Sequence, residues 1–314
     1  MSTRKATVHS LAKINLDLRV LHKRADGFHE IRTVFQTISL ADRIDIEYEA
    51  GRRSEVVLDD PLAIPDNLIT RAVEALEIRG RVRIRLRKRI PMGAGLGGGS
   101  SNAAAVLLAL PVLAGKRIPF ERLAGMAQGL GSDVPFFLEG GTALGLGRGE
   151  ELYPLPDLKR QPLLVVPTGF HVSTGPAYRA LHRELTSPES SRYINNFRLL
   201  VRALVDGRSA GAASALSAND FEPVVFREFP PIQDLMRQLS KPGVGVRMTG
   251  SGSAVFAIFE SVEARTCARR KLNFKVLPAW LVTRAGYRRL WRKQLREHLD
   301  ENDNAWPPPS RYAR

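Results

Sequence analysis

The stretch PMGAGLGGGSSNAAAVLLAL, residues 91–110, carries the strongest signal for the fold. Five glycines fall within seven positions, serines follow at 100 and 101, and the chain then becomes apolar. Glycine allows positive φ angles and a close approach of the backbone to a ligand. A helix beginning at about Ser101 would turn unpaired N–H groups and its dipole toward an anion. The stretch therefore predicts a phosphate-binding loop whose helix is anchored in the core.

Two well-known phosphate loops fit this stretch less well. Residues 93–98 match G-x-G-x-x-G, but a Rossmann site needs a buried strand before the loop and a carboxylate about 20 residues after it. Here RVRIRLRKRI (81–90) carries arginine at every second position, and the first carboxylate near the expected place is Glu121. A Walker A loop needs a lysine after its last glycine, where this chain has Ser100. A glycine turn without a ligand remains the simpler alternative to a loop that binds phosphate through backbone amides alone.

The composition limits the class of protein. The 314 residues suit one large or two ordinary domains, and 44% are hydrophobic, which is enough for a core. The longest apolar run, residues 103–114, contains a proline and is too short to span a bilayer. Cys267 is the single cysteine, which excludes a disulfide framework and a multi-cysteine metal site. With no apolar signal core at the N-terminus, we expect a cytoplasmic protein.

The net charge of +15 is explained either by a solvated basic surface or by an attraction to polyanions. Charge alone does not separate nucleic acid from a phosphorylated small molecule. No basic block resembles a nucleic-acid motif, which makes nucleic acid the less expected partner of the two. We also expect no membrane contact and a monomer or weak homodimer.

Hydrophobic periodicity predicts most of the elements. Alternation indicates strands at 10–21, 43–48, 54–59, 81–90, 161–168 and 280–287, with two more around a Gly/Ser turn in 243–260. Helical spacing indicates helices at 67–78 with Asp66 as N-cap, at 120–130, within 174–240 and at 261–272. The stretch 132–155 predicts strand, turn, strand.

A Pro-rich segment, residues 152–162, predicts a domain boundary near residue 158. We therefore expect domains at 1–157 and 158–287, followed by a basic tail at 288–314. In the tail, Trp291, Leu295 and Leu299 recur at helical spacing. This predicts a helix packed on the second domain and then a disordered Pro-rich end, with dimer contact or weak polyanion binding as the alternatives.

The glycine stretch resembles the P-x-x-x-G-L-G-S-S-A-A signature of the GHMP kinases, which include galacto-, homoserine, mevalonate and phosphomevalonate kinases. Further stretches at 12–44, 66–69, 131–150 and 247–259 are similar to the branch whose acceptor alcohol carries a cytidine diphosphate. The match runs in order from about residue 8 to about 286. The tail from Arg288 lies outside the pattern.

The resemblance implies an α+β, two-domain fold. The N-terminal domain would contain a left-handed βαβ crossover, the C-terminal domain would be a ferredoxin-like α/β sandwich, and the active site would lie in the cleft between them. The reaction would transfer the γ-phosphate of ATP, with Mg²⁺, to the 2-hydroxyl of a cytidylated methylerythritol in isoprenoid precursor synthesis. No aspartate pair indicates a metal cage, so we expect no protein metal site and Mg²⁺ held mainly through ATP phosphates.

The resemblance assigns catalysis to Lys13 and Asp133. Asp133 precedes the apolar run VPFFL, where a carboxylate is costly unless it is paired or used, although a turn aspartate is an equal alternative. Lys13 lies on the polar face of the first strand, where a solvated lysine is the more ordinary outcome. In the family, Asp133 would accept the hydroxyl proton, and Lys13 would orient the hydroxyl or offset phosphoryl charge.

The binding residues also follow from the resemblance. ATP would contact Pro91, Met92, Gly93, Ala94, Gly95, Leu96, Gly97, Gly98, Gly99, Ser100, Ser101 and Asn67. Substrate would contact Asn15, Phe28, His29, Tyr178, Gly250, Ser251 and Gly252. Phe28 and Tyr178 would sandwich the cytosine, and His29 would offer a hydrogen-bonding edge. The family most often has tyrosine where this chain has Phe28, so stacking stays possible and a hydroxyl contact is lost.

Two other functions remain open at this stage. One is a GHMP kinase for another small alcohol, such as homoserine or mevalonate, for which a cytidine pocket would be pointless. The other is a basic RNA-binding protein that uses the arginines of 81–89 and the tail. A solvated sheet face explains that arginine row more simply.

Overall fold

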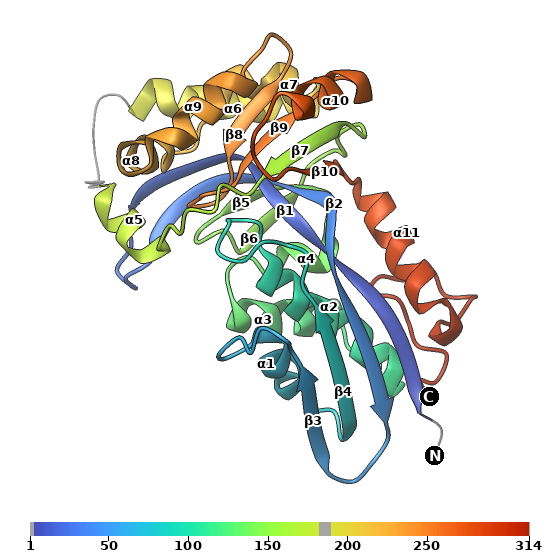
Figure 1. Ribbon diagram of the computed structural model, residues 1–314. Coiled ribbons are helices and arrows are strands. Elements are labelled where there is room, and N and C mark those ends of the chain that lie inside the picture. Colours follow the sequence, from blue (N-terminus) through green and yellow to red (C-terminus); the bar gives the residue numbers. More distant parts are fainter. Residues whose placement is uncertain (1–2, 182–189, 314) are drawn as a thin grey trace.

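Two long strands organise the computed structural model, which describes residues 3–181 and 190–313. β1 (Arg4–Lys23) pairs antiparallel with β2 (His29–Glu49). Figure 1 shows both strands running the length of the molecule, from the lower sheet to the helices at the top. The predicted strands 10–21 and 43–48 both exist, but each is only part of one of these longer strands. The two strands thereby join the two halves of the fold.

The first sheet has the order β3-β4-β2-β5-β6, with β1 also on β2. Its other strands are β3 (Ser54–Asp59), β4 (Gly80–Arg87), β5 (Thr142–Leu146) and β6 (Glu151–Pro154). β3 and β4 are parallel and are joined through α1 (Leu68–Ala75), which gives the expected βαβ crossover. In β4 every second residue is buried, and the arginines between them are exposed. Arg81 and Arg85 pair with Glu55 and Asp59, which supports a solvated face.

One face of this sheet is covered by α2 (Gly98–Ala114), α3 (Phe120–Leu130) and α4 (Phe136–Glu139). Residues 103–110 of α2 are apolar on every side of the helix, and accordingly they are at most 1% exposed. It begins at Gly98 rather than Ser101, because Gly97 adopts the left-handed conformation just before it. The stretch 132–155, predicted as strand, turn, strand, contains the β5–β6 hairpin at 142–154, but its first part forms the short helix α4 instead of a strand.

The second sheet has the order β10-β7-β9-β8, with every neighbouring pair antiparallel. Its strands are β7 (Pro162–Val166), β8 (Gly245–Met248), β9 (Val255–Ile258) and β10 (Leu277–Trp280). The helical elements are α5 (Thr174–Ala180), α6 (Ser190–Val205), α7 (Ala210–Ala213), η1 (Ser214–Leu216), α8 (Glu222–Glu228), α9 (Pro230–Leu239) and α10 (Val262–Arg270). In chain order, helices separate β7 from β8 and α10 separates β9 from β10, whereas β9 follows β8 without a helix between them. This arrangement confirms the ferredoxin-like α/β sandwich and the α+β class.

Two predicted element ends were wrong. Asn67, not Asp66, caps α1, because its Oδ1 accepts a hydrogen bond from Ile69 N at 3.0 Å. The strand predicted at 280–287 ends at Trp280, because Thr283 caps α11 (Arg284–Leu295) through a hydrogen bond from Gly286 N. Of the helices in the described residues, none is long and apolar enough to cross a membrane.

The C-terminal segment packs against the first sheet and not the second. α11 contacts β1 and α4, and Trp291 and Leu295 are buried in the core that contains α2. After η2 (Arg296–His298), the Pro-rich end lies on α2, where Ser310 Oγ donates to the carbonyl of Val112 at 2.6 Å. The prediction of a helix on its own domain with a disordered end was therefore wrong. The apolar residues of the tail find their partners on α2 and α4 instead.

A buried ion pair anchors β1 in the second half of the fold. Arg19 Nε lies 3.0 Å from Asp17 Oδ1, and both side chains are at most 2% exposed. Arg19 also donates to the carbonyls of Tyr193 and Leu216. Burial raises the pKa of Asp17 from 3.8 to about 6, although Arg19 opposes the shift. Because the pKa of Asp17 is higher in the folded protein than in the unfolded chain, its contribution to the free energy of unfolding is lost as the pH rises from 3.8 to about 6.

Arg19→Met should lower the free energy of unfolding by about 3–5 kcal/mol at pH 8, because Asp17 is then a buried charge without its partner. The loss should be clearly smaller at pH 5, below the pKa of about 6, where Asp17 is largely protonated. Urea denaturation at the two pH values measures both. Arg237→Met, which breaks an exposed pair with Asp234, is the control and should change little. An equal loss at both pH values would contradict the assignment.

Candidate active site

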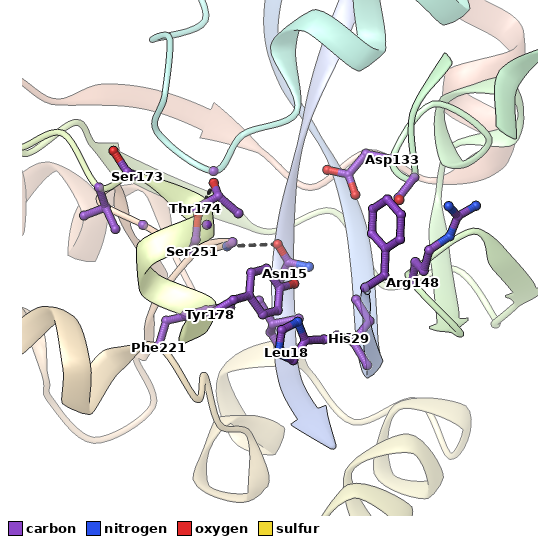
Figure 2. A pocket seen from close by; sticks show the side chains of 18 of the residues that line it. Asn15, Leu18, His29, Asp133, Arg148, Ser173, Thr174, Tyr178, Phe221 and Ser251 are labelled. Carbon is purple, nitrogen blue, oxygen red and sulfur yellow. Dashed lines mark hydrogen bonds between the residues drawn. The ribbon is translucent and has the colours of Figure 1, made fainter. Parts of the chain in front are cut away.

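A cavity of about 1130 Å³ lies where the two halves of the fold meet. β1, the β1–β2 hairpin, the glycine loop and the turn at 132–133 form one part of its wall. Residues 171–179 and 250–252 form the other part. Figure 2 shows Asp133 and Arg148 on one side, Ser173, Thr174 and Ser251 on the other, and Asn15 between them. The cavity therefore gathers segments that are far apart in the chain.

Lys13 and Asp133 meet in this cavity. Lys13 Nζ lies 3.4 Å from Asp133 Oδ2, and the lysine side chain is 4% exposed whereas the aspartate is 32% exposed. Lys13 Nζ also donates to Asn15 Oδ1 at 2.7 Å. The simple expectation of a solvated lysine was wrong, because the polar face of β1 is covered by the glycine loop here. A lysine ammonium has three donors, so hydrogen-bonding capacity is left for an oxygen of a ligand.

Asn15 ties the two halves of the wall together. Its Oδ1 accepts from Gly250 N at 3.0 Å, and its Nδ2 donates to Thr33 Oγ1 at 2.7 Å. Thr249 completes the tie, because Asn15 N donates to Thr249 Oγ1 and that hydroxyl donates to the carbonyl of Gly95. Asn15 lines the cavity, but its polar atoms already hold the loop at 249–250 in place.

The glycine loop has the backbone that an anion site needs. Gly93, Gly95 and Gly97 have φ angles of 62°, 74° and 68°, and all three line the cavity. α2 begins directly afterwards, so the N–H groups of its first turn lack helical partners. Ser101 N already donates to the carbonyl of Gly97, and Ser101 Oγ to the carbonyl of Leu11. The backbone N–H groups that could bind an anion are therefore those that precede Ser101 in the first turn of α2, and the N–H of Ser101 is not one of them.

The structure places the other predicted ATP residues around this loop but outside the cavity lining. Ala94 and Leu96 are buried in the core, and Met92 is 59% exposed. Asn67 caps α1, and its neighbour Leu68 lies 3.8 Å from the Cβ position of Gly99. Pro91, Gly98, Gly99, Ser100 and Ser101 likewise lie outside the lining.

The hairpin tip carries the predicted base-binding residues. Phe28 is 51% exposed, and the guanidinium of Arg148 lies 4.8 Å from the centre of its ring. His29 stacks on Tyr178 with ring centres 4.6 Å apart, and Tyr178 meets Phe221 edge-on. Burial, and then the charge of Asp133, raise the pKa of Tyr178 to about 12. Because His29 covers one face of Tyr178, the structure does not present Phe28 and Tyr178 as an open sandwich.

The cavity is strongly cationic. Lys13, Lys23, Arg148 and Arg179 line it, whereas Asp133 is the single carboxylate among the described residues of its wall. Arg148 is held by Glu150, whose Oε1 accepts from Arg148 Nε at 3.2 Å. Such a surplus of positive charge favours ligands that carry several phosphates.

Sequence reasoning missed several of these groups. Lys88 Nζ pairs with the buried Asp42. It also lies 2.9 Å from the point that a Cβ atom would occupy if Gly98 had a side chain. A lysine side chain thus does reach the loop that was expected to use amides alone. Its place three residues before Pro91 could have suggested this. Arg148 and His171 also line the cavity, but nothing in their local sequence separates them from other turn residues.

Known proteins match this architecture. A model of the GHMP kinases N terminal domain matches residues 67–141, and a model of the GHMP kinases C terminal domain matches residues 200–275. A curated relative from Solibacter usitatus, 4-diphosphocytidyl-2-C-methyl-D-erythritol kinase, is 48% identical over 322 residues, covering 99% of each chain. The chain belongs to the GHMP kinase family.

This GHMP kinase is similar to further relatives of the same name. One from Pelotomaculum thermopropionicum is 40% identical and covers 84% of this chain and 93% of its own. A crystal structure of 4-(cytidine 5'-diphospho)-2C-methyl-D-erythritol kinase is 36% identical, with a TM-score of 0.72 over 88% of this chain and 98% of that one. This GHMP kinase is accordingly a phosphotransferase with an alcohol group as acceptor.

Proposed function

We propose that this GHMP kinase transfers the γ-phosphoryl group of ATP to the 2-hydroxyl of 4-diphosphocytidyl-2-C-methyl-D-erythritol, in isoprenoid precursor synthesis. The observation that carries the proposal is the position of the Lys13–Asp133 pair. It lies in one cavity with the glycine loop and with the aromatic, cationic hairpin tip. Relatives that carry this activity in their names support the choice of alcohol.

ATP fits the glycine loop. Positive φ angles at Gly93, Gly95 and Gly97 expose backbone toward the cavity, and α2 begins directly after this loop, so that its dipole favours a phosphate there. The part of the chain that the structure describes contains no group of three or more His, Cys, Asp or Glu residues that could hold a metal ion. We expect Mg²⁺ to be held through ATP oxygens and water, where it would neutralise phosphate charge.

Asp133 would act as the base. The hydroxyl proton passes to its carboxylate, the hydroxyl oxygen bonds to the γ-phosphorus, and ADP leaves with the electrons of the broken bond. Lys13, buried and fixed by Asn15, directs positive charge at the transferring group. Lys13 is buried and its Nζ already lies 3.4 Å from Asp133 Oδ2, which limits the reorganisation that the reaction needs.

The hairpin tip would hold the cytidine diphosphate. The exposed ring of Phe28 offers a stacking face, His29 a hydrogen-bonding edge, and Lys23 and Arg148 charge for the diphosphate. Tyr178 would support His29 from behind and contact the base only after that ring moves. Gly250, Ser251 and Gly252 would contribute amides from the opposite wall, and Asn15 would hold them there.

The substrate assignment predicts a clear order of turnover. With ATP and Mg²⁺, the cytidylated alcohol should give a kcat/KM at least about 100-fold above those of homoserine and mevalonate, because neither fills a cationic hairpin tip. ADP release measures all three. Equal or faster turnover of homoserine or mevalonate would overturn this substrate assignment and favour another GHMP activity.

We place the reaction in the cytoplasm and expect a monomer or weak homodimer.

A further inference from the structure

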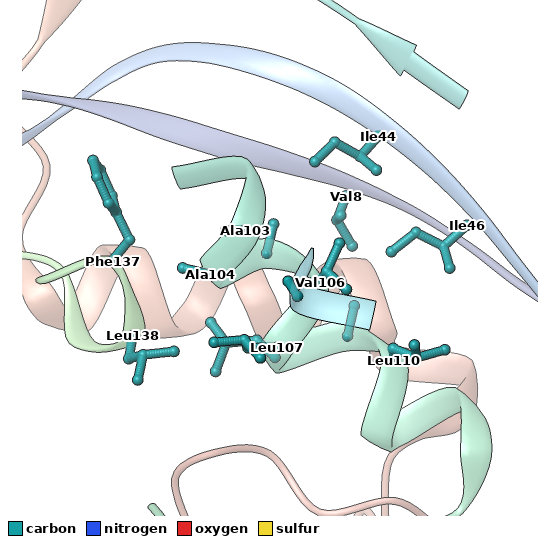
Figure 3. Packing of buried hydrophobic residues seen from close by; sticks show 14 of the residues in the cluster. Val8, Ile44, Ile46, Ala103, Ala104, Val106, Leu107, Leu110, Phe137 and Leu138 are labelled. Atoms are coloured by element: carbon teal, nitrogen blue, oxygen red, sulfur yellow. The ribbon is translucent and has the colours of Figure 1, made fainter. Parts of the chain in front are cut away.

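The segment 284–313, here called the C-terminal brace, covers the part of the chain that follows Asp133. It comprises α11, η2 and the residues after them, and both family-model matches end before it begins. Figure 3 shows Phe137 and Leu138 of α4 beside α2. α11 of the brace also contacts α4, and its residues Tyr287, Trp291 and Leu295 belong to the same buried core as α2 and α4.

The brace supplies hydrogen bonds that α4 cannot make for itself. A helix of one turn leaves its last carbonyl groups without helical partners. Tyr287 Oη donates to the carbonyl of Phe137, and Trp306 Nε1 donates to the carbonyl of Leu138 at 3.0 Å. Arg288 then reaches Glu139, with 3.5 Å between Nη2 and Oε2. Three successive residues of α4 are thus held from one surface.

These contacts are directly connected to the turn that carries Asp133. Val134 N donates to the carbonyl of Gly131, and Phe137 N donates to the carbonyl of Val134, so 131–137 is one hydrogen-bonded unit. The ring of Phe137 is fully buried. Its Cζ lies 2.8 Å from the point that a Cβ atom would occupy if Gly97 had a side chain. Phe137 therefore both accepts the hydrogen bond from Tyr287 and packs α4 against the glycine loop.

We propose that Tyr287 and Trp306 are positioning residues that fix the carboxylate of Asp133 for phosphoryl transfer. This inference rests on the proposed role of Asp133. Tyr287 is 1% exposed, and burial raises the pKa of its hydroxyl, which remains a donor over the working range of pH. The brace links the catalytic turn to the far end of the chain.

Tyr287→Phe tests this, because it removes the hydroxyl and keeps the ring. We expect kcat to fall by about 10- to 100-fold, as small displacements of a reacting group do, while KM for ATP and for the alcohol changes less than about twofold. Trp306→Phe should act in the same direction. In an Asp133→Asn background, followed with radiolabelled ATP, Tyr287→Phe should cause no further loss of kcat.

Ser310→Ala is the matched control, because it removes a hydrogen bond from the brace to α2 and leaves α4 untouched. It should lower Tm without lowering kcat. An unchanged kcat in Tyr287→Phe and Trp306→Phe would overturn the inference. So would an equal loss in the Asp133→Asn background, or an equal loss in Ser310→Ala. The proposed function fails separately, if the wild-type protein does not phosphorylate the cytidylated alcohol or if Asp133→Asn is fully active.

Discussion

Asp133→Asn should lower kcat by about 100- to 10,000-fold, because the amide cannot accept the hydroxyl proton. KM for ATP should change little, since the glycine loop and the start of α2 are not altered. Steady-state kinetics with varied ATP and varied alcohol measures both parameters. The side chain is 32% exposed and keeps its size, so the fold should tolerate the change.

Asp234→Asn is a suitable control for this variant, because Asp234 is an exposed residue of α9 whose partner is Arg237 on the same helix. Its kcat should equal that of the wild-type protein. If Asp133→Asn retained activity within a few-fold of the wild type, Asp133 could not be the base. The lysine alone would then have to account for the catalytic contribution of the pair.

Gly95→Ala should abolish measurable ATP turnover and lower Tm by several degrees. A Cβ at this position would lie 2.0 Å from the carbonyl oxygen of Thr249, and the φ angle of +74° is itself unfavourable for alanine. The clash involves backbone on both sides, so the glycine loop and the loop at 249–250 would be forced apart. Both walls of the cavity would move.

Gly125→Ala is the matched control for Gly95→Ala. Gly125 lies within α3 and has nothing within 4 Å of its Cβ position. Alanine there should stabilise the helix by about 0.5–1 kcal/mol and leave the kinetics unchanged. A Gly95→Ala protein with normal KM for ATP and normal kcat would show that the contact between Gly95 and Thr249 is not needed for the site.

The elements that were predicted well owe their pattern to local burial. β4 alternates strictly because one face of it is buried and the other is solvated. β3 was predicted with the observed bounds, although its inner residues are only half-buried. α2 was predicted from an apolar run but starts earlier than expected. Its first turn opens with two glycines, which have poor helix propensity, and the buried remainder of the helix that stabilises this turn is not visible in the local sequence.

Errors arose where a distant partner decides the structure. Trp291, Leu295 and Leu299 gave a helical pattern, but the sequence does not say which surface these residues cover, nor that Trp306 of the Pro-rich end reaches α4. The polar face of β1 suggested a solvated Lys13, yet the glycine loop covers it. Periodicity describes which residues share a face and not what lies against that face.

The candidate site shows the same division. Local sequence alone suggested the anion loop, whereas the pairing of Lys13 with Asp133 came from the family resemblance, and the structure then placed them 3.4 Å apart. Local patterns could not supply that pair because its members lie on β1 and before α4. Arg148 and Lys88 were missed because each reaches the site from an ordinary-looking turn or strand end.

Phosphorus and proton NMR of the reaction product tests the central claim most directly. The wild-type protein, incubated with ATP, Mg²⁺ and 4-diphosphocytidyl-2-C-methyl-D-erythritol, should yield one new phosphomonoester on the 2-hydroxyl and an equal amount of ADP. A phosphate on another hydroxyl, or ADP formed with no phosphorylated alcohol, would contradict the proposed function.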